Sequence, residues 1–595
     1  MKYADLGTTF ARPQDLGFVF PYTHKTFISA VESAITTDTE ITFLMKREVF
    51  KLSPTSKTGS KFYIENAYEL LDEAGEFYYN AGEGVIYYMP YPGEDLLSAD
   101  TYVGAVEGLV NVSGSSSTNK VCNITFENLT FRYGAYDFIS KYGLTGHQAD
   151  GISSNMFTAA DGQTAYFAQF AVNNADNINI EACEFSCLGS AGISMIDSVS
   201  NSSINGNIIR DTAGTGIRIG APSHQRISDD VEVCRNIDIT NNVLRRTSSE
   251  SFNNTAISVY YEKYINISNN DIGSIPYTGI SAGWGWTESV PYDCSDIIIS
   301  NNRITDVMQT LDDGGGIYTL GTLKNSKICG NCLDGHASVH GGMIYNDEGS
   351  AYIVVHDNVI LDATNSLQCH YRPGSTRHIN YYNNYAERLS QNKPENQTST
   401  DENGVTDYEK YYTSIVMEEL MDAVSHPSDV AQIRANTGLT AEYTYLLDKI
   451  EEPNGRLVRY NIPSEPISDE ITIAAAEFDS ATSSPSMSIV AMPDGSAVNL
   501  ENGKTVGYNV TVPKAGWYKF LVYGHYEGTK PALNVSGTMT QTAMGNNPGI
   551  ADKVDGRWTI GRFYFEEVEN QIVLSAAENA SGIIIQRAST LFKDL

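Results

Sequence analysis

The sequence predicts an all-β protein, in which a parallel β-helix with flanking helices is followed by a C-terminal antiparallel β-sandwich. Three observations lead to this fold class. Asparagine recurs at intervals of 26 to 35 residues through the middle of the chain, short segments there alternate apolar and polar residues, and from residue 471 the chain changes to short strands separated by turns. The first two are typical of a stack of coils, and the third is typical of a sandwich.

Each recurring asparagine stands just before an apolar or β-branched run. Units rich in Asn and Gly cannot be helical hairpins, because both residues are unfavourable inside helices and the apolar residues recur at every second position. Neighbouring strands in a stack lie about 4.8 Å apart, so we expect the amide side chains to bond to adjacent turn backbone, each contributing about 1 kcal/mol. The positions are Asn207, Asn242, Asn270, Asn302, Asn331, Asn358 and Asn384.

Six segments align on one apolar column, and alternation then assigns each position to the inside or the outside of the coil. The two inward columns are Ile217, Ile257, Ile280, Ile317, Ile344, Leu367 and Ile219, Val259, Ala282, Thr319, Asn346, Cys369. The two outward columns are expected to face solvent as a polar and aromatic surface. They are Arg218, Ser258, Ser281, Tyr318, Tyr345, Gln368 and Gly220, Tyr260, Gly283, Leu320, Asp347, His370.

The chain is expected to have five parts. The first contains, within residues 64–95, a short helix and then two strands around a Gly-Glu-Gly turn. The parts are a mixed β-rich region at 1–110 that is joined to the β-helix, the coils at 111–388, a helical flank or cap at 389–450, a linker at 451–470 and the sandwich at 471–595.

Two helices are expected in the flank or cap. Residues 411–421 have helical spacing, and a second helix should begin after Pro427 with Ser428 as its N-cap. These helices would cover the open end or the flank of the stack, whose last coil would otherwise be an aggregation-prone edge.

Two of the four tryptophans, Trp517 and Trp558, lie in the predicted sandwich. They are either core residues of a structural sandwich or the aromatic platform of a carbohydrate-binding module. Trp517 follows Ala-Gly and precedes an alternating strand, which favours a core position.

Composition limits the partners. The formal net charge of −33 argues against nucleic acid and anionic membranes, because both require clustered Lys and Arg. No apolar run approaches the roughly 20 residues of a membrane span, and the first ten residues have no signal-peptide core. We expect the chain as given to be cytoplasmic, or secreted if its N-terminus has been trimmed.

Eight cysteines are too few for a disulfide scaffold of this length, and most lie among β-type residues as small hydrophobes. Cys329 and Cys332 form a CxxC, but no second CxxC or histidine pair accompanies it. We therefore expect neither a metal ion nor a cofactor.

The densest acidic cluster consists of Asp312 and Asp313 before three glycines, and Asp347 and Glu348 one coil later. Neighbouring carboxylates raise one another's pKa and divide into a proton donor and an ionised partner, which is what glycosidic cleavage requires. Asp beside Gly is also ordinary turn chemistry.

Aligning the two Ile-Tyr dipeptides places Asp313 and Asp347 at opposite ends of their strands. Curvature or the glycine run must therefore bring the two carboxylates together, or the pair includes Glu348. Glu262 and Asp150 are the reserve acids.

Several other residues are candidates for substrate binding. Aromatic faces stack on sugar rings, and imidazole or guanidinium groups bond to hydroxyls. Packing against the coils is the alternative role for the tryptophans. The candidates are Trp284, Trp286, Tyr318, Tyr345, His340, His370, Arg218, Tyr260 and His147.

Several motifs together resemble the right-handed parallel β-helix glycosidases of glycoside hydrolase family 141 and, more distantly, family 120. They are IENAYELLDEAGEFYYNAGEGVIYYMPYPGED, VCNITFENLTF, GISAGWGW, DDGGGIYTLG and IYNDEGS, spread over residues 60–450. The resemblance implies hydrolysis of a fucoside, xyloside or related bond in a plant or host glycan, with Asp313 and either Asp347 or Glu348 as the carboxylates. VTVPKAGWYKFLVYG is similar to sandwich modules often appended to such enzymes.

Two other classes remain open. A β-helix polysaccharide lyase would need a Lys, Arg or His base and a Ca²⁺ ion or an Arg to neutralise a uronate. A non-catalytic glycan-binding surface protein could use the same fold. In each case the expected partner is an oligosaccharide or polysaccharide.

Overall fold

The computed structural model divides into two compact units, residues 1–446 and 447–595. It describes residues 9–46, 50, 62–145, 148–222, 224, 229–285, 294–336, 340–370, 376–392 and 415–450, except 151–167. In the second unit it describes 471–474, 478, 483–484, 488–492, 495–500, 504–511, 516–525, 533–538, 540–541, 556–565, 569–576 and 583–592.

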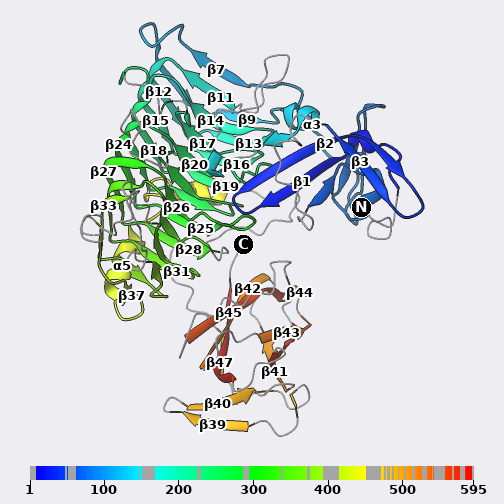
Figure 1. Cartoon of the computed structure of the whole chain (residues 1–595), viewed down its shortest axis with the longest axis vertical. Coiled ribbons are helices and arrows are strands. Elements are labelled where there is room, and N and C mark those ends of the chain that lie inside the picture. The colour runs from blue at the N-terminus through cyan, green and yellow to red at the C-terminus, as the bar shows by residue number, and fades with distance from the viewer. Residues whose placement is uncertain are drawn as a thin grey trace, which may run out of the picture. The chain divides into compact units, whose positions relative to one another are not determined.

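Three parallel sheets of ten strands each form the body of the first unit (Figure 1). The chain visits the sheets in turn, so that each coil contributes one strand to each. This is the predicted right-handed parallel β-helix, and the fold class is confirmed.

We name the sheets by their place in the coil. The site sheet contains β7 (Val110–Ser113), β11 (Ala168–Asn173), β14 (Ala191–Met195), β17 (Ile217–Ile219), β20 (Ile257–Val259), β23 (Ile280–Ala282), β26 (Ile317–Thr319), β29 (Ile344–Asn346), β32 (Leu367–Cys369) and β35 (Gln391–Asn392). The second sheet contains β8 (Val121–Glu127), β12 (Ala175–Glu181), β15 (Val199–Asn205), β18 (Arg235–Thr240), β21 (Lys263–Ser268), β24 (Cys294–Ser300), β27 (Thr322–Cys329), β30 (Ala351–His356), β33 (Arg377–Tyr382) and β36 (Ile415–Met417). The third sheet contains β9 (Thr130–Arg132), β13 (Glu184–Leu188), β16 (Ile208–Thr212), β19 (Val243–Thr247), β22 (Asp271–Gly273), β25 (Arg303–Val307), β28 (Cys332–His336), β31 (Val359–Leu361), β34 (Tyr385–Ala386) and β37 (Met421–Asp422).

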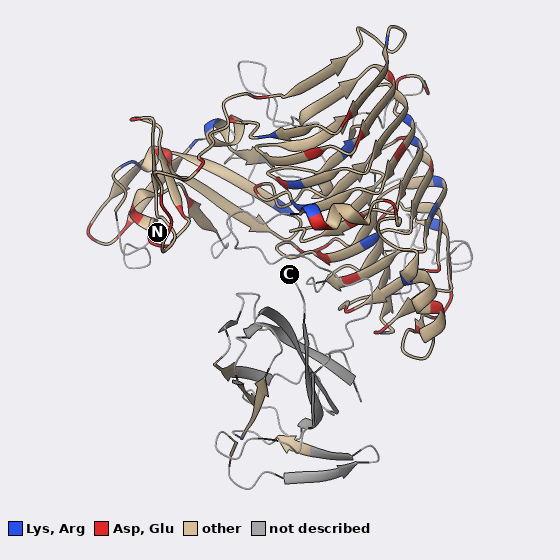
Figure 2. Ribbon diagram, turned by 180° about the vertical axis from the view of Figure 1, so that it is seen from behind, with Lys and Arg blue, Asp and Glu red and all other residues tan. Residues whose placement is uncertain are grey.

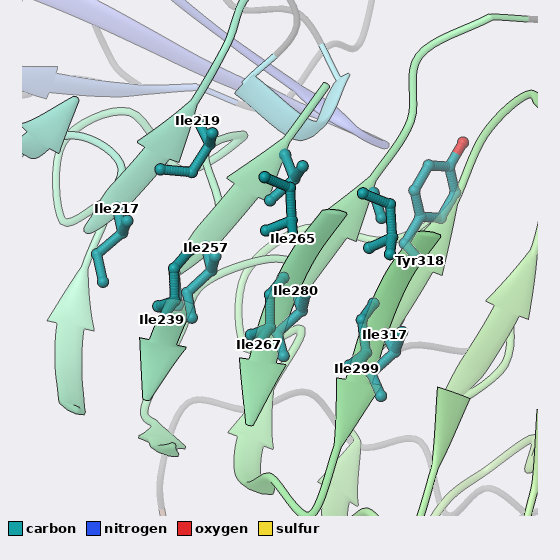
Figure 3. Packing of buried hydrophobic residues seen from close by; sticks show 14 of the residues in the cluster. Ile217, Ile219, Ile239, Ile257, Ile265, Ile267, Ile280, Ile299, Ile317 and Tyr318 are labelled. Carbon is teal, nitrogen blue, oxygen red and sulfur yellow. The ribbon is translucent and has the colours of Figure 1, made fainter. Parts of the chain in front are cut away.

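The register of the site sheet is the predicted one. Ile217 pairs with Ile257, Ile257 with Ile280 and Ile280 with Ile317, and the pairing continues to Leu367. Figure 3 shows these isoleucines stacked inside the coils, with the ring of Tyr318 leaving its strand on the opposite side from Ile317. The isoleucines of this column are fully buried, so each rung adds apolar area to one continuous core.

The expectation that the outward columns face solvent is wrong for most of their residues. Arg218, Ser258, Ser281, Tyr318 and Tyr345 are at most 3% exposed, and in the next column Tyr260, Leu320 and Asp347 are also buried. The reason is that other parts of the chain cover this face. Phe252, for example, packs both against the coil core and against a cluster formed by Val19, Ile28 and Leu144.

The asparagine ladder lies inside the coils. Each side-chain amide of the first six members donates to the Oδ1 of the next asparagine at 2.9–3.0 Å. The same Oδ1 accepts the backbone N–H of the preceding member at 2.9–3.2 Å, and each Nδ2 also donates to a carbonyl of the preceding coil. The amides thus bond both to turn backbone, as predicted, and to one another.

The residue before each ladder asparagine has a left-handed backbone conformation, with φ between 51° and 68°. Only Gly, Asn and Asp adopt this conformation at low cost, which explains the Gly-Asn, Asn-Asn and Asp-Asn pairs in the sequence. These residues are Gly206, Asn241, Asn269, Asn301, Gly330, Asp357 and Asn383.

A separate antiparallel sheet is formed by four strands that precede the coils and by one short strand that follows the first coil. It contains β1 (Gly17–Tyr22), β2 (Lys25–Thr36), β3 (Ile41–Met45), β4 (Tyr63–Glu65) and β10 (Leu144–Thr145). The tight turn between β1 and β2 reaches the coils, where the carbonyl of Thr23 accepts the backbone N–H of Asp312 at 2.7 Å. The predicted short helix and strand pair are also present as η2 (Tyr68–Leu70), β5 (Phe77–Asn80) and β6 (Val85–Tyr88).

The end of the first unit differs from expectation. Residues 415–421 are not helical: β36 and β37 pair with β33 and β34 as further rungs. The helix after residue 426 exists as α5 (Pro427–Ala435), but its N-cap is His426 and not Ser428, because Pro427 already occupies its first turn. Val430 of α5 packs with Val359 and Tyr385 on the flank of the third sheet.

A segment that we call the strap, residues 436–446, then runs back along one corner of the coils. It contacts residues at the turns of successive coils, and three of them, Asn301, Asn269 and Asn241, have the left-handed backbone conformation. Gly438 bonds to Asn301 and Asn269, Thr440 donates to Asn241 Oδ1, and the Tyr443 hydroxyl accepts from Asn205 at 2.7 Å.

The second unit is antiparallel, as expected for a sandwich. One sheet contains β38 (Ile471–Ala474), β39 (Ser488–Met492), β40 (Gly495–Leu500), β42 (Gly516–His525), β44 (Thr540–Gln541), β45 (Gly556–Phe565) and β47 (Ile583–Phe592), and the other contains β41 (Thr505–Thr511), β43 (Leu533–Gly537) and β46 (Glu569–Ala576). Tyr508, Ile572 and Leu574 of the smaller sheet are fully buried. Trp517 and Trp558 lie on β42 and β45, but their side chains are outside the described part, so their role stays a prediction.

All eight cysteines are free thiols. No helix among the described residues is long and apolar enough to cross a membrane. Figure 2 shows acidic and basic residues interspersed along the described coils.

A buried ion pair occupies one corner of the coils. His224 Nδ1 lies 2.6 Å from Glu262 Oε1, and both side chains are at most 1% exposed. His224 Nε2 also lies 3.1 Å from Asp197, and Cys234 N–H donates to the second oxygen of Glu262. Burial opposes protonation of His224, but the two carboxylates outweigh it and raise its pKa to about 9.

Asn302→Ala should lower the free energy of unfolding by about 2–4 kcal/mol. It removes the acceptor of the buried Asn270 backbone N–H and breaks the amide bonds that Asn302 makes with Asn270, with the Ile267 carbonyl and with Asn331 Oδ1. The measurement is urea-induced unfolding. The control is Asn266→Ala, which removes one half-exposed side-chain bond to Asp238. Equal losses in both variants would contradict a stabilising role of the ladder.

The free energy of unfolding should also fall as the pH rises from 6.5 through about 9. The folded state raises the pKa of His224 above its ordinary 6.5, so the stabilisation is complete below 6.5 and disappears as the pH passes the folded pKa. The shift corresponds to about 3 kcal/mol. A His224→Gln/Glu262→Gln double variant should lack this decline; an identical decline in that variant would refute the assignment.

Candidate active site

A cavity of about 310 Å³ lies where β26, β29 and β32 end. Its size is at the lower end of the range of small-molecule sites. It is lined by His24, Lys25, Gln148, Trp284, Asp313, Tyr345, Asp347, Glu348 and His370. The three candidate carboxylates therefore face one cavity, together with three of the predicted substrate-binding residues.

Asp347 follows β29 directly and is held by four donors. Oδ2 accepts the Tyr318 hydroxyl at 2.5 Å. Oδ1 accepts the Tyr345 hydroxyl at 3.1 Å and the Glu348 N–H at 2.7 Å, and lies 2.7 Å from His370 Nδ1. The two tyrosines come from consecutive rungs, because Tyr318 pairs with Tyr345 in the sheet register.

These donors determine the charge of Asp347. Burial alone would raise its pKa, but the hydrogen bonds from His370, Tyr318 and the Glu348 N–H hold it below the ordinary 3.8. The same contact with Asp347 raises the pKa of His370 above 6.5. The contact thus favours the ionised form of Asp347 and the protonated form of His370.

Asp313 reaches the cavity from the opposite end of its strand. Its backbone is left-handed, with φ of 60°, and its carbonyl accepts the Tyr277 hydroxyl at 2.7 Å and the Gln148 amide at 3.1 Å. The carboxylate lies 3.2 Å from His24 Nδ1 and is about one-third exposed. Asp313 is therefore more accessible than Asp347, whose side chain is only 10% exposed.

The glycine run after Asp313 allows the coils to approach closely. A Cβ on Gly315 would lie 2.4 Å from the carbonyl oxygen of Gly342 in the next coil, and one on Gly314 would lie 2.7 Å from the Tyr277 ring. Side chains at these positions would push the rungs apart. The glycines thus permit the packing that brings Asp313 toward the end of β29.

Asp312, next to Asp313, turns away toward His340. The imidazole Nδ1 lies 2.5 Å from Asp312 Oδ2, and the His340 N–H donates to Oδ1 at 3.0 Å. His340 is largely exposed and does not line the cavity. This pair fixes the loop that carries Asp313, whereas His340 was predicted to contact substrate directly.

Three cavity residues were not predicted: His24, Lys25 and Gln148. They come from the β1–β2 turn and from η3 (Gln148–Asp150), both far in the sequence from β26, β29 and β32. The sequence around His24 reads as a short turn between alternating strands, and nothing in it indicates which coil the turn will meet. His147 and Trp286 lie outside the described residues, as does the side chain of Asp150.

Two other predicted residues, Arg218 and Tyr260, form a packed row with Trp284 before the cavity. The Arg218 guanidinium lies 5.2 Å from the centre of the Tyr260 ring, and that ring lies 6.4 Å from Trp284 at 67°. Arg218 and Tyr260 are at most 2% exposed and do not line the cavity, whereas Trp284 does. Glu262, the reserve acid, belongs to the buried pair with His224 and is also absent from the lining.

The described residues contain no group of three His, Cys, Asp or Glu side chains arranged to hold a metal ion. The polar groups that line the cavity are three carboxylates, two imidazoles, a phenol hydroxyl, an indole, an amide and an ammonium group.

No protein-family model matches the sequence, and neither does a curated protein. Among solved structures, one named glycoside hydrolase is 26% identical, with a TM-score of 0.57, and covers 73% of this chain and 72% of its own. Two matches are weaker. The pectate lyase Pel9A is 11% identical, with a TM-score of 0.33, and the match covers 50% of this chain and 66% of Pel9A. The tailspike protein gp49 of Acinetobacter baumannii bacteriophage Fri1, a capsular polysaccharide depolymerase, is 10% identical, with a TM-score of 0.21, and the match covers 71% of this chain and 59% of gp49. The chain is similar to the first over most of both lengths.

Proposed function

We propose that this chain is a glycoside hydrolase that cleaves a fucoside, xyloside or related glycosidic bond with two carboxylates. The observation that carries the proposal is the cavity in which Asp313, Asp347 and Glu348 meet beside Trp284 and Tyr345. The similarity to a structure named glycoside hydrolase supports it.

The environments of the carboxylates suggest their roles. Glycosidic cleavage needs one carboxylate that stays ionised and one that donates a proton to the leaving oxygen. Asp347 receives four hydrogen-bond donors and suits the ionised role, as nucleophile, base or stabiliser of the cationic transition state. Asp313 and Glu348, with side chains about one-third exposed, are the candidates for the proton donor.

The remaining groups would position the sugar. Trp284 and Tyr345 offer aromatic surface to the apolar face of a ring. His24 contacts the Asp313 carboxylate and would orient it toward the bond. Tyr345 belongs to β29 and His24 to the tight turn between β1 and β2, whereas Trp284 follows β23 by two residues.

A polysaccharide lyase is the second candidate, favoured by one observation. Lys25 lines the cavity and forms no ion pair with any other residue that the structure describes. Its amino group, in the deprotonated form, would supply the base that a lyase requires. A lyase would release unsaturated, ultraviolet-absorbing products from a polyuronate, whereas a hydrolase would not.

Asp347→Asn should lower kcat by roughly 100- to 10,000-fold on both 4-nitrophenyl and methyl glycosides, because the ionised group acts whatever the leaving group. The proton-donor variant, Asp313→Asn or Glu348→Gln, should lose far more activity on methyl glycosides than on 4-nitrophenyl glycosides, since nitrophenolate leaves without a proton. Initial rates on a panel of sugars, in EDTA, measure both effects.

The matched control is Asp238→Asn on the exposed side of β18, which should leave both rates unchanged. Full activity of folded Asp347→Asn and Asp313→Asn variants would refute the two-carboxylate proposal.

His370→Gln should move the acid limb of kcat/KM to higher pH. His370 lowers the pKa of Asp347, so its removal lets that pKa rise and the carboxylate protonates at a higher pH. The control is His378→Gln, an exposed histidine that stacks on Tyr352 in the second sheet. If the acid limb of His370→Gln did not shift, the ionisation that controls activity would not be that of Asp347.

A further inference from the structure

We infer that the cavity is a blind pocket that receives the end of a glycan chain, so that the enzyme removes terminal sugars. The inference rests on the proposed hydrolase function. It starts from the outward face of the site sheet, which was expected to be exposed to solvent and is instead mostly buried.

The rungs before the cavity offer no path for a polysaccharide. A chain lying along the site sheet would cross the outward positions of β17, β20 and β23 before it reached β26. Those positions are Arg218, Ser258 and Ser281, and they are only 1–2% exposed. An accessible sugar-binding groove there would require exposed side chains.

A row of three side chains separates these rungs from the cavity. Arg218 donates from Nε to the Gly220 carbonyl at 3.1 Å and places its guanidinium over Tyr260. Tyr260 meets Trp284 edge to face, and Trp284 faces the cavity. Because Arg218 and Tyr260 are almost fully buried, displacing the row would cost their packing, their hydrogen bonds and the cation–π contact.

The turn between β1 and β2 limits the cavity on a second side. Thr23 bonds to the backbone of Asp312, and His24 contacts the Asp313 carboxylate. The turn therefore lies across the start of the loop that leads into β26. A polymer could pass there only if this contact opened.

The later rungs are more open. His370 after β32 is 39% exposed and Glu348 is 31% exposed, and Gln368 on β32 is half-buried. This side is where the departing part of the substrate would extend. A pocket closed on one side and open on the other accommodates one terminal sugar, with the scissile bond at its mouth.

The test compares three probes built on the sugar that the aryl glycoside panel identifies: its 4-nitrophenyl glycoside, the corresponding disaccharide glycoside, and that disaccharide with the terminal unit capped by O-methylation at its chain-extending hydroxyl. We expect the first to be cleaved directly. The second should release free sugar first and nitrophenol after a lag. The capped probe should release neither sugar nor nitrophenol, because the pocket has no room for the added methyl group or for a further sugar unit.

Nitrophenol released without a lag from the disaccharide glycoside, or cleavage of the capped probe at a rate like that of the uncapped one, would overturn the inference while leaving the hydrolase proposal intact. Absence of hydrolysis with every sugar of the panel would instead remove the proposed function, and the inference with it.

A wall variant gives a second measurement. Trp284→Ala removes the end of the row facing the cavity and should raise the rate on the capped probe relative to the uncapped one. Tyr264→Ala, at an exposed position of β21, is the matched control and should leave the ratio unchanged. A folded Trp284→Ala variant with an unchanged ratio would show that the wall does not exclude the cap.

Discussion

The buried asparagine ladder is the constraint on which the rest of the structure depends. Each amide satisfies backbone groups of two coils and bonds to the next amide, so every coil is held in one register with its neighbours. A slip of one residue would exchange the inner and outer columns, placing Tyr318 inside the coil and Ile317 outside. The position of the site sheet is therefore set at a distance from the cavity, by turns that take no part in it.

That register accounts for the environment of Asp347. Tyr318 and Tyr345 can both donate to one carboxylate because they occupy the same column on neighbouring rungs. A buried carboxylate without such donors would become protonated. His370, one rung further, places its Nδ1 2.7 Å from Asp347 Oδ1. Three rungs of a repeating scaffold thus produce one polar site through differences at equivalent positions, Tyr, Tyr and Gln in one column and Leu, Asp and His in the next.

The sequence alone was sufficient for features that recur locally. The ladder and the inward isoleucine columns follow from spacing and alternation, and both are confirmed. The outward columns were assigned to solvent because the repeat itself does not show which other segments cover the outward face of the site sheet. The contacts that matter, such as His24 with Asp313, join residues nearly three hundred positions apart and depend on tertiary packing. Residues 415–421 were mistaken for a helix because their strands, of three and two residues, are too short to show the alternation of apolar and polar residues.

The strap has a consequence for how the solenoid comes apart. In a stack whose coils contact only their neighbours, the terminal coils can fray without disturbing the middle. Here residues 436–446 connect the turn at Asn301 to those at Asn269, Asn241 and Asn205, across several coils. Unfolding of the last coils would therefore also strain the hydrogen bonds between the strap and these earlier coils. The stability of the C-terminal half thus depends on that of coils much nearer the start of the chain.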